Sequence, residues 1–348
     1  MNQRGGAERV FAHIARAYPE APIYTALFDA QKTGDLFSGR AIRVSALARL
    51  PGANHYFRAL APFYPAAFEA FDFSGYDTIV SSTTAWAKGI RVPPGAIHVC
   101  YINTVSRFVF AYDQYLGGFG IKELARPLAM RLARWDRQAA RRPTALIANS
   151  RNVAERVRRY YERDAFVLHC PVELDRFTPG AGEGDYFFIA SRLLPYKHIE
   201  RAIDACAAAR VPLLVAGGGP AEAALRRRAR ASTTTMLGFI DDARLNSLLG
   251  NARAAIVPGE EDFGLVALEA AATGTPTIAL RAGGALETIL ENETGEYFDE
   301  PHSPALQAAI ERFDRRRYDP ARLRAHAQTF SPDRFIAQLR QLVASIRR

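Results

Sequence analysis

The 348-residue sequence has few cysteines, no long apolar run and no internal repeat of fixed period. Cys100, Cys170 and Cys206 are widely spaced and form no CxxC pattern. They predict small core residues of a reducing compartment, not a disulfide framework or a zinc site. No stretch reaches the roughly 18 apolar residues of a membrane-spanning helix, and residues 1–6 lack the apolar core of a signal peptide. We therefore expect a cytoplasmic protein.

Length and composition favour two globular domains. The chain is about twice the usual length of a single domain, and apolar residues make up 49% of it, which is enough for substantial cores. No compositional bias predicts disorder.

The net charge of +9 is unevenly distributed. Residues 1–170 hold 23 Lys and Arg against 13 Asp and Glu, whereas the remainder holds 22 against 23. A basic half beside a neutral half indicates contact with an anionic surface, either nucleic acid or phospholipid. Because the sequence lacks the interleaved aromatic and basic residues of a nucleic-acid surface, we expect no nucleic-acid partner.

Strands and helices alternate in both halves of the sequence. Apolar runs predict buried parallel strands at 77–82, 97–102 and 145–150, and later at 186–190, 213–216, 235–237, 254–257 and 277–280. Helical periodicity covers 121–142 and 151–163, and Ser331-Pro332-Asp333 predicts the start of a last helix.

This alternation predicts an α/β fold of two facing, doubly wound parallel-sheet domains of Rossmann-like type. Proline and glycine mark a linker at 171–184. The expected divisions are an N-terminal domain at 1–170, a C-terminal domain at 185–330 and a C-terminal helix at 331–348.

The strongest chemical signal is the segment 258–270, in which a loop after a strand becomes a helix at Gly264. The free N–H groups and positive dipole of such a helix start suit a phosphate. Glu269 on this helix is placed to accept hydrogen bonds from a ribose diol, and Glu261 on the loop can reach a sugar hydroxyl. The alternative is that both glutamates only cap and solvate the helix.

Three weaker signals follow other predicted strands. Arg192 and Lys197 could converge on a diphosphate and offset the charge of a leaving group, or could be ordinary surface cations. The Gly217-Gly218-Gly219 turn and the Gly238-Phe239 strand end carry little weight alone.

Together and in this order, the motifs resemble family 4 of the glycosyltransferases, which are retaining enzymes of GT-B architecture, over nearly the whole chain. The resemblance implies that Arg192 and Lys197 bind the donor diphosphate, that Glu269 binds the ribose and that Glu261 holds the transferred sugar. The segment 4–10 resembles the family's first glycine-rich loop. Implied catalytic residues are Asn103, Arg192, Lys197 and Glu261, and implied donor-binding residues are Gly5, Gly6, Gly238, Phe239, Asp262, Phe263, Gly264, Leu265 and Glu269.

Two positions depart from the family pattern. The glycine-rich loop begins at residue 4, so the first strand of the N-terminal sheet is missing from the sequence. Asn103 stands where the family commonly has histidine, and Val105 where it has proline. Asparagine can hydrogen-bond a sugar but carries no proton at neutral pH.

Within this family, the sequence motifs most resemble those of bacterial mannosyltransferases of polysaccharide and O-antigen assembly, many of which use GDP-mannose. We therefore expect a retaining hexosyltransferase that moves mannose to a glycan or lipid-linked acceptor without a cofactor. The pair Asp241-Asp242 is more typical of a helix cap than of a metal site, so we expect no metal. Alternatives are a UDP- or dTDP-sugar transferase, a related epimerase or phosphorylase, and a non-catalytic nucleotide-sugar binder.

The helix at 121–142 has a basic face. Arg126, Arg134, Arg137 and Arg141 fall within about 80° of one another at 100° per residue, opposite leucines and Trp135. This pattern suits peripheral contact with anionic lipid, or is only the solvated face of a packed helix. The segment 112–119 is the candidate acceptor loop.

Overall fold

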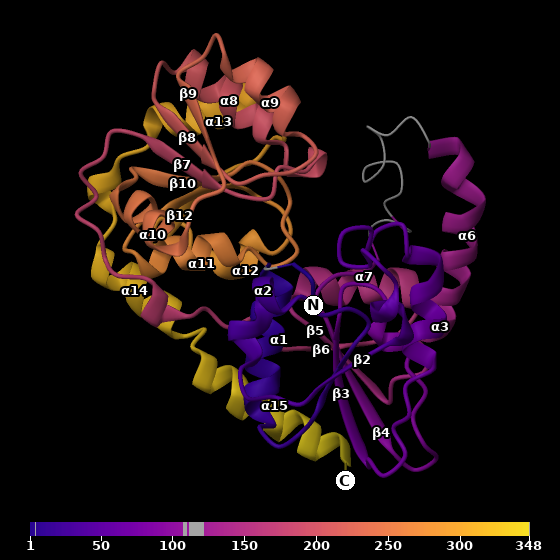
Figure 1. Cartoon of the computed structure of the whole chain (residues 1–348). Coiled ribbons are helices and arrows are strands. Elements are labelled where there is room, and N and C mark those ends of the chain that lie inside the picture. Colours follow the sequence, from indigo (N-terminus) through magenta and orange to yellow (C-terminus); the bar gives the residue numbers. More distant parts are fainter. Residues whose placement is uncertain (4, 107–109, 111–121, 348) are drawn as a thin grey trace. The chain divides into compact units, whose positions relative to one another are not determined.

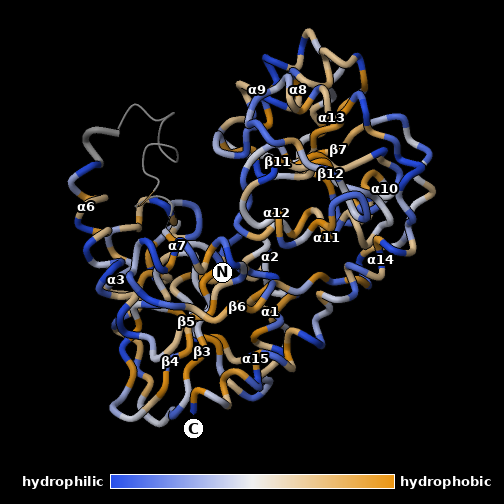
Figure 2. Tube along the Cα trace, turned by 180° about the vertical axis from the view of Figure 1, so that it is seen from behind, coloured by the Kyte–Doolittle hydropathy of each residue, from blue (hydrophilic) through white to orange (hydrophobic). Residues whose placement is uncertain are grey.

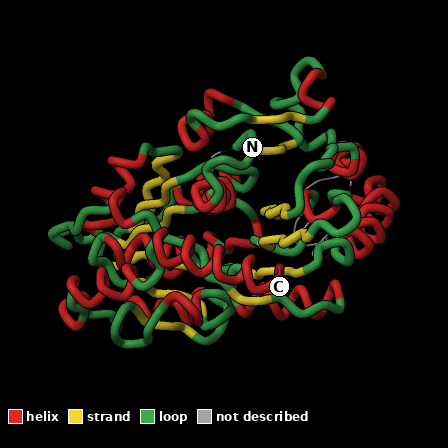
Figure 3. Tube along the Cα trace, turned by 90° about the horizontal axis from the view of Figure 1, so that it is seen from below, coloured by secondary structure: helices red, strands yellow, loops and turns green. Residues whose placement is uncertain are grey.

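The computed structural model describes residues 1–3, 5–106, 110 and 122–347, without the side chains of 122–125. The chain divides into two compact units, which are coloured along the sequence in Figure 1. The N-terminal unit comprises Met1–Pro171 with Pro332–Arg348, and the C-terminal unit comprises Val172–Ser331. Each unit is built on parallel strands with helices beside them (Figure 3). The predicted α/β class with two Rossmann-like domains is confirmed.

The N-terminal unit contains a four-stranded parallel sheet of order β3-β4-β5-β6. Three of its strands lie in apolar runs that predicted them, and they are mostly orange in the hydropathy colouring of Figure 2. Tyr101 and Ile147 at its centre are fully buried. The strands are β3 (Thr78–Thr83), β4 (Ile97–Ile102), β5 (Ala145–Ala148) and β6 (Phe166–Val167).

A separate two-stranded parallel sheet in the same unit pairs β1 (Ile23–Thr25) with β2 (Ile42–Val44). The C-terminal helix α15 returns to this unit and packs on α1, where the Arg340 guanidinium donates to Ala17 O at 2.8 Å. The helices are α1 (Gly6–Ala17), α2 (Ala30–Thr33), α3 (Tyr64–Glu69), α6 (Lys122–Ala139), α7 (Arg151–Tyr161) and α15 (Pro332–Arg347), with 3-10 turns η1 (Gly34–Phe37), η2 (Ala46–Arg49), η3 (Ala61–Phe63) and η4 (Ala87–Gly89).

His98 on β4 is a buried neutral histidine in the core of this unit. Its side chain is 1% exposed, and its Nε2 lies 2.7 Å from Ser81 Oγ. Burial, with a smaller effect of Arg163, lowers the pKa of His98 from 6.5 to about 3. Because the unfolded chain takes up a proton on this ring below pH 6.5 and the folded chain does not, the stability that neutral His98 provides is lost as the pH falls from 6.5 towards 3.

We expect acid to destabilise the protein less when His98 is replaced by glutamine. At pH 5 the native protein should lose about 2 kcal/mol through this histidine, at 1.36 kcal/mol per pKa unit, and His98→Gln should remove that part of the loss. Thermal unfolding followed from pH 7.5 to 4.5 measures the slope. His55→Gln, at an exposed histidine, is the matched control, and equal slopes for both variants would refute the assignment.

The C-terminal unit contains a six-stranded parallel sheet of order β12-β11-β10-β7-β8-β9. The chain runs outward from β7 through β8 to β9 and then returns to place β10 on the other side of β7. The point between β7 and β10 is therefore a topological switch, the usual position of a ligand crevice in such sheets. The strands are β7 (Phe187–Ala190), β8 (Leu213–Ala216), β9 (Thr234–Gly238), β10 (Ala254–Val257), β11 (Thr277–Leu280) and β12 (Gly295–Phe298).

Helices of this unit connect successive strands, as expected for parallel pairing. The connecting helices are α8 (Ile199–Ala208), α9 (Glu222–Ala229), α10 (Asp242–Asn251), α11 (Leu265–Ala272) and α12 (Ala285–Thr288). Two further helices, α13 (Ser303–Arg312) and α14 (Pro320–Gln328), follow the last strand, and the 3-10 turns are η5 (Leu174–Arg176), η6 (Pro195–Lys197) and η7 (Arg315–Arg317). In the described part of the chain no helix has the length and apolar character to cross a bilayer.

Candidate functional site

An ion pair joins the loops that follow β7 and β10 at the topological switch. Lys197, the last residue of η6, places Nζ 2.5 Å from Oε2 of Glu261. The two side chains are only 16% and 20% exposed, so the pair is partly shielded from water. The structure thus brings together two residues that the sequence placed in separate motifs.

Close backbone packing holds these loops in place. The Gly284 N–H donates to Glu261 O at 2.9 Å, and a Cβ at Gly284 would lie 2.3 Å from Phe263 Cα. A Cβ at Gly259 would lie 2.9 Å from Lys197 O. The sequence motifs indicate no role for Gly259 or Gly284, although the glycines in the loops that follow strands β10 and β11 were a signal for them. Larger residues at these positions would separate Glu261 from Lys197.

Helix α11 begins at the same loop. Gly264 is its N-cap with φ +94°, a left-handed conformation that glycine adopts without strain, and Phe263 before it is buried. The first turn of α11 starts at Leu265, and the half-buried Glu269 lies in its second turn. The half-buried Asp262 precedes the cap. The helix start therefore carries the partial positive charge predicted for a phosphate site.

The loops after β7, β8 and β9 are also in direct contact. Gly217 has φ +124°, its N–H donates to Gly238 O at 2.7 Å, and a Cβ on it would lie 1.9 Å from Ser191 O. Only glycine can occupy this position. Phe239, directly after β9, is 90% exposed, and Arg192 is exposed on the loop after β7.

The carboxyl edge of this sheet therefore gathers Lys197, Glu261, the start of α11, Arg192 and Phe239. Two cations and a helix N-terminus suit a phosphorylated ligand, carboxylates suit hydroxyl donors, and the exposed ring offers a stacking surface. Among the described residues, the Arg192 guanidinium makes no ion pair, so it can contact a ligand without breaking one.

Three predicted site residues belong to the N-terminal unit. Asn103 is 8% exposed, and its Nδ2 donates to Ser82 Oγ at 2.8 Å and to Thr83 O at 3.3 Å. Gly5 caps α1 in an extended conformation, and Gly6 is the first residue of that helix. The side-chain amide hydrogens of Asn103 are thus engaged within its own sheet.

Several other predictions can be compared with the structure. The candidate acceptor loop 112–119 lies outside the described residues. Asp241 caps α10 by accepting from the Arg244 N–H at 2.7 Å, which confirms the interpretation of the Asp241-Asp242 pair as a helix cap. Within the described ranges, no group of three or more His, Cys, Asp or Glu side chains could hold a metal ion. The three cysteines are buried, as predicted, and form no disulfide bond.

Two family profiles match adjacent parts of the chain. Residues 4–176 match the profile described as Glycosyltransferase Family 4, and residues 172–330 match that of Glycosyl transferases group 1. Together they account for all but the two ends of the chain.

Two curated relatives show modest similarity. A GDP-mannose-dependent alpha-(1-6)-phosphatidylinositol dimannoside mannosyltransferase of Mycobacterium tuberculosis is 38% identical over 149 residues, which is 40% of this chain and 39% of the relative. A D-inositol 3-phosphate glycosyltransferase of Streptomyces scabiei is 29% identical over 209 residues, 50% of this chain and 47% of the relative. The similarity therefore spans less than half the length of these relatives.

Solved structures share the fold. Alr3699/HepE of Anabaena, in complex with UDP, superposes with a TM-score of 0.70 at 18% identity over 99% of this chain and 98% of its own. Sucrose-phosphate synthase of Thermosynechococcus elongatus gives 0.68 at 21% identity over 88% and 83%. At these identities the likeness concerns the architecture of the two Rossmann-like domains.

Proposed function

The chain belongs to the GT-B glycosyltransferases of group 1 and family 4, and from this premise we propose that it transfers a sugar, with retention of configuration, from a nucleoside diphosphate to a glycan or lipid-linked acceptor. The observation that carries the proposal is the meeting of Lys197, Glu261 and the start of α11 at the switch between β7 and β10. This edge offers positive charge for a diphosphate beside a carboxylate for a sugar hydroxyl.

Each group has a defined part in the proposed reaction. Lys197, Arg192 and the amides at the start of α11 stabilise the charge on the departing nucleoside diphosphate, an effect realised fully in the transition state. Glu269 accepts hydrogen bonds from the ribose diol, and Glu261 orients the transferred sugar. The acceptor hydroxyl attacks the anomeric carbon on the face that the diphosphate leaves, and a leaving phosphate oxygen takes its proton. The sequence lacks an obvious acid–base carboxylate pair, which is consistent with such a pathway.

The donor that we favour is GDP-mannose. One support is the mycobacterial relative, whose name includes GDP-mannose and mannosyltransferase. The other is the amino-acid sequence of the motifs around Lys197 and Glu261. The Anabaena protein binds UDP, but it shares only the fold with this chain, so its ligand is weaker support for the donor. UDP-glucose therefore serves as the comparison donor.

We place the enzyme at the inner face of a membrane, where it would meet a lipid-linked acceptor. Exposed Arg126, Arg134, Arg137 and Arg141 on and just after α6 support this placement, as do the exposed apolar side chains of Leu128 and Met130 on the same helix. The three buried cysteines form no disulfide bond, which agrees with a reducing compartment.

A second candidate is a nucleotide-sugar binder without turnover. Asn103 favours it, because an amide cannot transfer a proton and its two N–H groups are already bonded to Ser82 and Thr83. Both candidates predict that the chain binds a nucleotide sugar, but only the transferase would also transfer or hydrolyse it.

Nucleotide binding tests the proposal directly. We expect GDP at about 100 times its Kd to stabilise the protein by about 2.7 kcal/mol, with UDP, dTDP and ADP giving less. GDP-mannose should then be hydrolysed slowly, and mannose should be transferred to acceptor with its anomeric configuration kept, as NMR of the product can establish. Binding without hydrolysis or transfer would favour the second candidate. A folded chain that binds none of the four nucleotides would refute both.

A further inference from the structure

Helix α11 of the candidate site packs against α14 within the C-terminal unit (Figure 1). It begins at Leu265, directly after the loop that carries Glu261, and ends at Ala272. Helix α14 ends at Gln328, and Phe330 follows two residues later, just before the chain leaves this unit. Contacts from α14 and from Phe330 reach both ends of α11.

Arg324 on α14 fixes the carboxyl end of α11. Its Nη1 donates to Ala272 O at 2.6 Å and to Phe177 O at 2.9 Å. Ala272 is the last residue of α11, and the last carbonyl groups of a helix have no partner within the helix. The guanidinium therefore satisfies one of these groups and places a positive charge at the negative end of the helix dipole.

The ring of Phe330 contacts the other end of α11. Its centroid lies 5.9 Å from that of the Phe263 ring, and the two planes are inclined by 60°, an arrangement within the range of attractive aromatic pairs. Phe263 is 3% exposed and stands directly before Gly264, the N-cap of α11. Phe330 therefore supports the residue from which the helix starts.

Phe330 is itself held in place by its neighbours. Its carbonyl accepts from the Val172 N–H at 2.9 Å, and the His326 ring packs against its ring at 5.4 Å between centroids. His326 Nε2 in turn lies 3.0 Å from the carbonyl oxygen of Thr288. The Thr288 hydroxyl adjoins the same N-cap, because a Cβ on Gly264 would lie 3.0 Å from its Oγ1. Two lines of contact thus run from the end of α14 to the start of α11.

We propose that Phe330 is a positioning residue of the donor site. Its ring holds Phe263 and thereby fixes the loop 261–264 and the first turn of α11 in the geometry that binds the diphosphate. This role rests on the function proposed above for that loop, and Phe330 acts through Phe263 without contacting the donor. A misplacement of about 1 Å caused by a change away from the chemistry can cost about 100-fold in rate, so the support of this loop matters for transfer.

Amide exchange in Phe330→Ala tests the proposal without a nucleotide. The Gly284 N–H, which donates to Glu261 O at 2.9 Å, reports on the loop, and the Ala267 N–H, which donates to Gly264 O at 3.0 Å, reports on the first turn of α11. We expect both amides to exchange about tenfold faster or more, because the loop opens locally more often. Phe330→Tyr, which keeps the ring, should stay within about twofold of the wild type.

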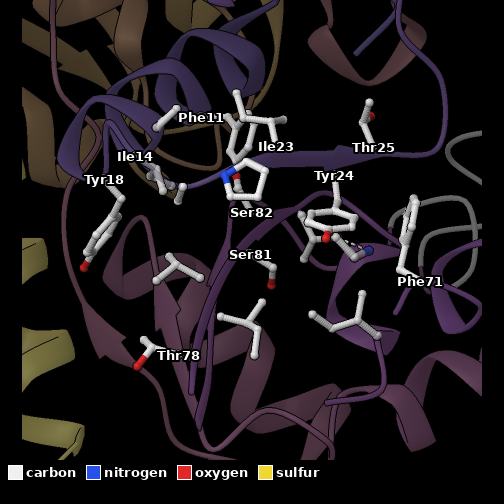
Figure 4. Close-up of a pocket in the computed structure, with 18 of the residues that line it drawn as sticks. Phe11, Ile14, Tyr18, Ile23, Tyr24, Thr25, Phe71, Thr78, Ser81 and Ser82 are labelled. Carbon is white, nitrogen blue, oxygen red and sulfur yellow. Dashed lines mark hydrogen bonds between the residues drawn. The ribbon is translucent and has the colours of Figure 1, made fainter. Parts of the chain in front are cut away.

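Two other phenylalanines serve as matched controls. Phe313 is a buried ring of the same unit that stacks on Tyr318, with 5.5 Å between the ring centroids. Phe71 is a half-buried ring of the N-terminal unit, at the wall of a cavity of about 600 Å³ (Figure 4). All rates are divided by that of Leu213 on β8, whose N–H donates to Thr233 O at 3.1 Å, so that a general loss of stability does not raise the ratio. Alanine at either control position should leave the ratio unchanged or lower it.

Kinetics with GDP-mannose complete the test. Phe330→Ala should lower kcat by about 10- to 100-fold at a temperature where the variant is folded, and Phe330→Tyr should restore it. Should the alanine variant fail to fold, Phe330→Leu takes its place in both measurements. An unchanged exchange ratio in the folded variant would overturn the proposal, and so would an equal rise in Phe313→Ala, because Phe330 would then contribute only to stability. Faster loop exchange in a chain that binds no nucleotide would leave the support of the loop standing and refute the proposed function instead.

Discussion

Lys197→Ala should lower kcat for sugar transfer by about 100- to 1,000-fold, the usual cost of removing one group that stabilises developing charge. Lys197 Nζ lies beside Glu261 at the start of the α11 loop, where the diphosphate of the donor is proposed to leave. Because this charge grows in the transition state, kcat should fall much more than KM rises. Steady-state kinetics with GDP-mannose measure both constants.

The control for this variant is Lys32→Ala. Lys32 is an exposed lysine that is also paired with an acidic residue, Asp29, at 3.1 Å, so its removal tests the loss of a lysine away from the site. It should leave kcat within about twofold of the wild-type value, as expected for an exposed ion pair. If Lys197→Ala keeps a wild-type Tm and a wild-type kcat, the role of Lys197 in the reaction is wrong.

The sequence predicted the fold well where strands are fully buried. The runs at 213–216, 254–257 and 277–280 became β8, β10 and β11 with the same bounds, because a strand covered on both faces must be continuously apolar. It missed β1, β2 and β6, which are only two or three residues long, and Phe166 and Val167 of β6 are also 52% and 41% exposed. No apolar run identifies such strands, and only pairing with a neighbour defines them.

The missed strand β12 has a different cause. Its sequence Gly-Glu-Tyr-Phe has a carboxylate in a position that is 6% exposed. Glu296 is tolerated there because Tyr318 Oη donates to it at 2.9 Å and Arg312 Nε lies 3.3 Å away. Both partners come from later in the chain, so no local pattern could reveal that Glu296 is satisfied within a buried strand.

The candidate site was predictable as a set of motifs but not as a geometry. Each motif could be found because it follows a strand and contains glycine or charge. The pairing of Lys197 with Glu261, 64 positions apart, depends on β10 returning to the side of β7, and the order of strands in a sheet is not written in any one motif. For the same reason, only the structure shows that position 284 requires glycine, because a Cβ there would collide with the backbone of Phe263.

A second lysine, Lys88, lies at the centre of a buried polar cluster in the N-terminal unit. Only four of the 45 basic residues are lysines, and this one is 1% exposed, with Nζ 2.5 Å from Asp136 Oδ1. Ser106 Oγ donates to the same oxygen at 2.6 Å, and Tyr161 Oη donates to the other at 2.7 Å. The cluster links η4, α6 and α7 through hydrogen bonds. These bonds explain how the charged side chains of Lys88 and Asp136 can be buried in the core.

Lys88→Met should destabilise the N-terminal unit by about 3–5 kcal/mol, because it leaves the carboxylate of Asp136 buried without its cation. At about 2–4 °C per kcal/mol, the Tm should fall by about 6–20 °C, as circular dichroism or calorimetry can measure. The double variant Lys88→Met with Asp136→Asn should recover most of the loss, since the amide still accepts from Ser106 or Tyr161 and no charge remains buried. A double variant as unstable as the single one would mean that Lys88 contributes through packing, and a single variant within about 1 kcal/mol of wild type would refute the buried pair itself.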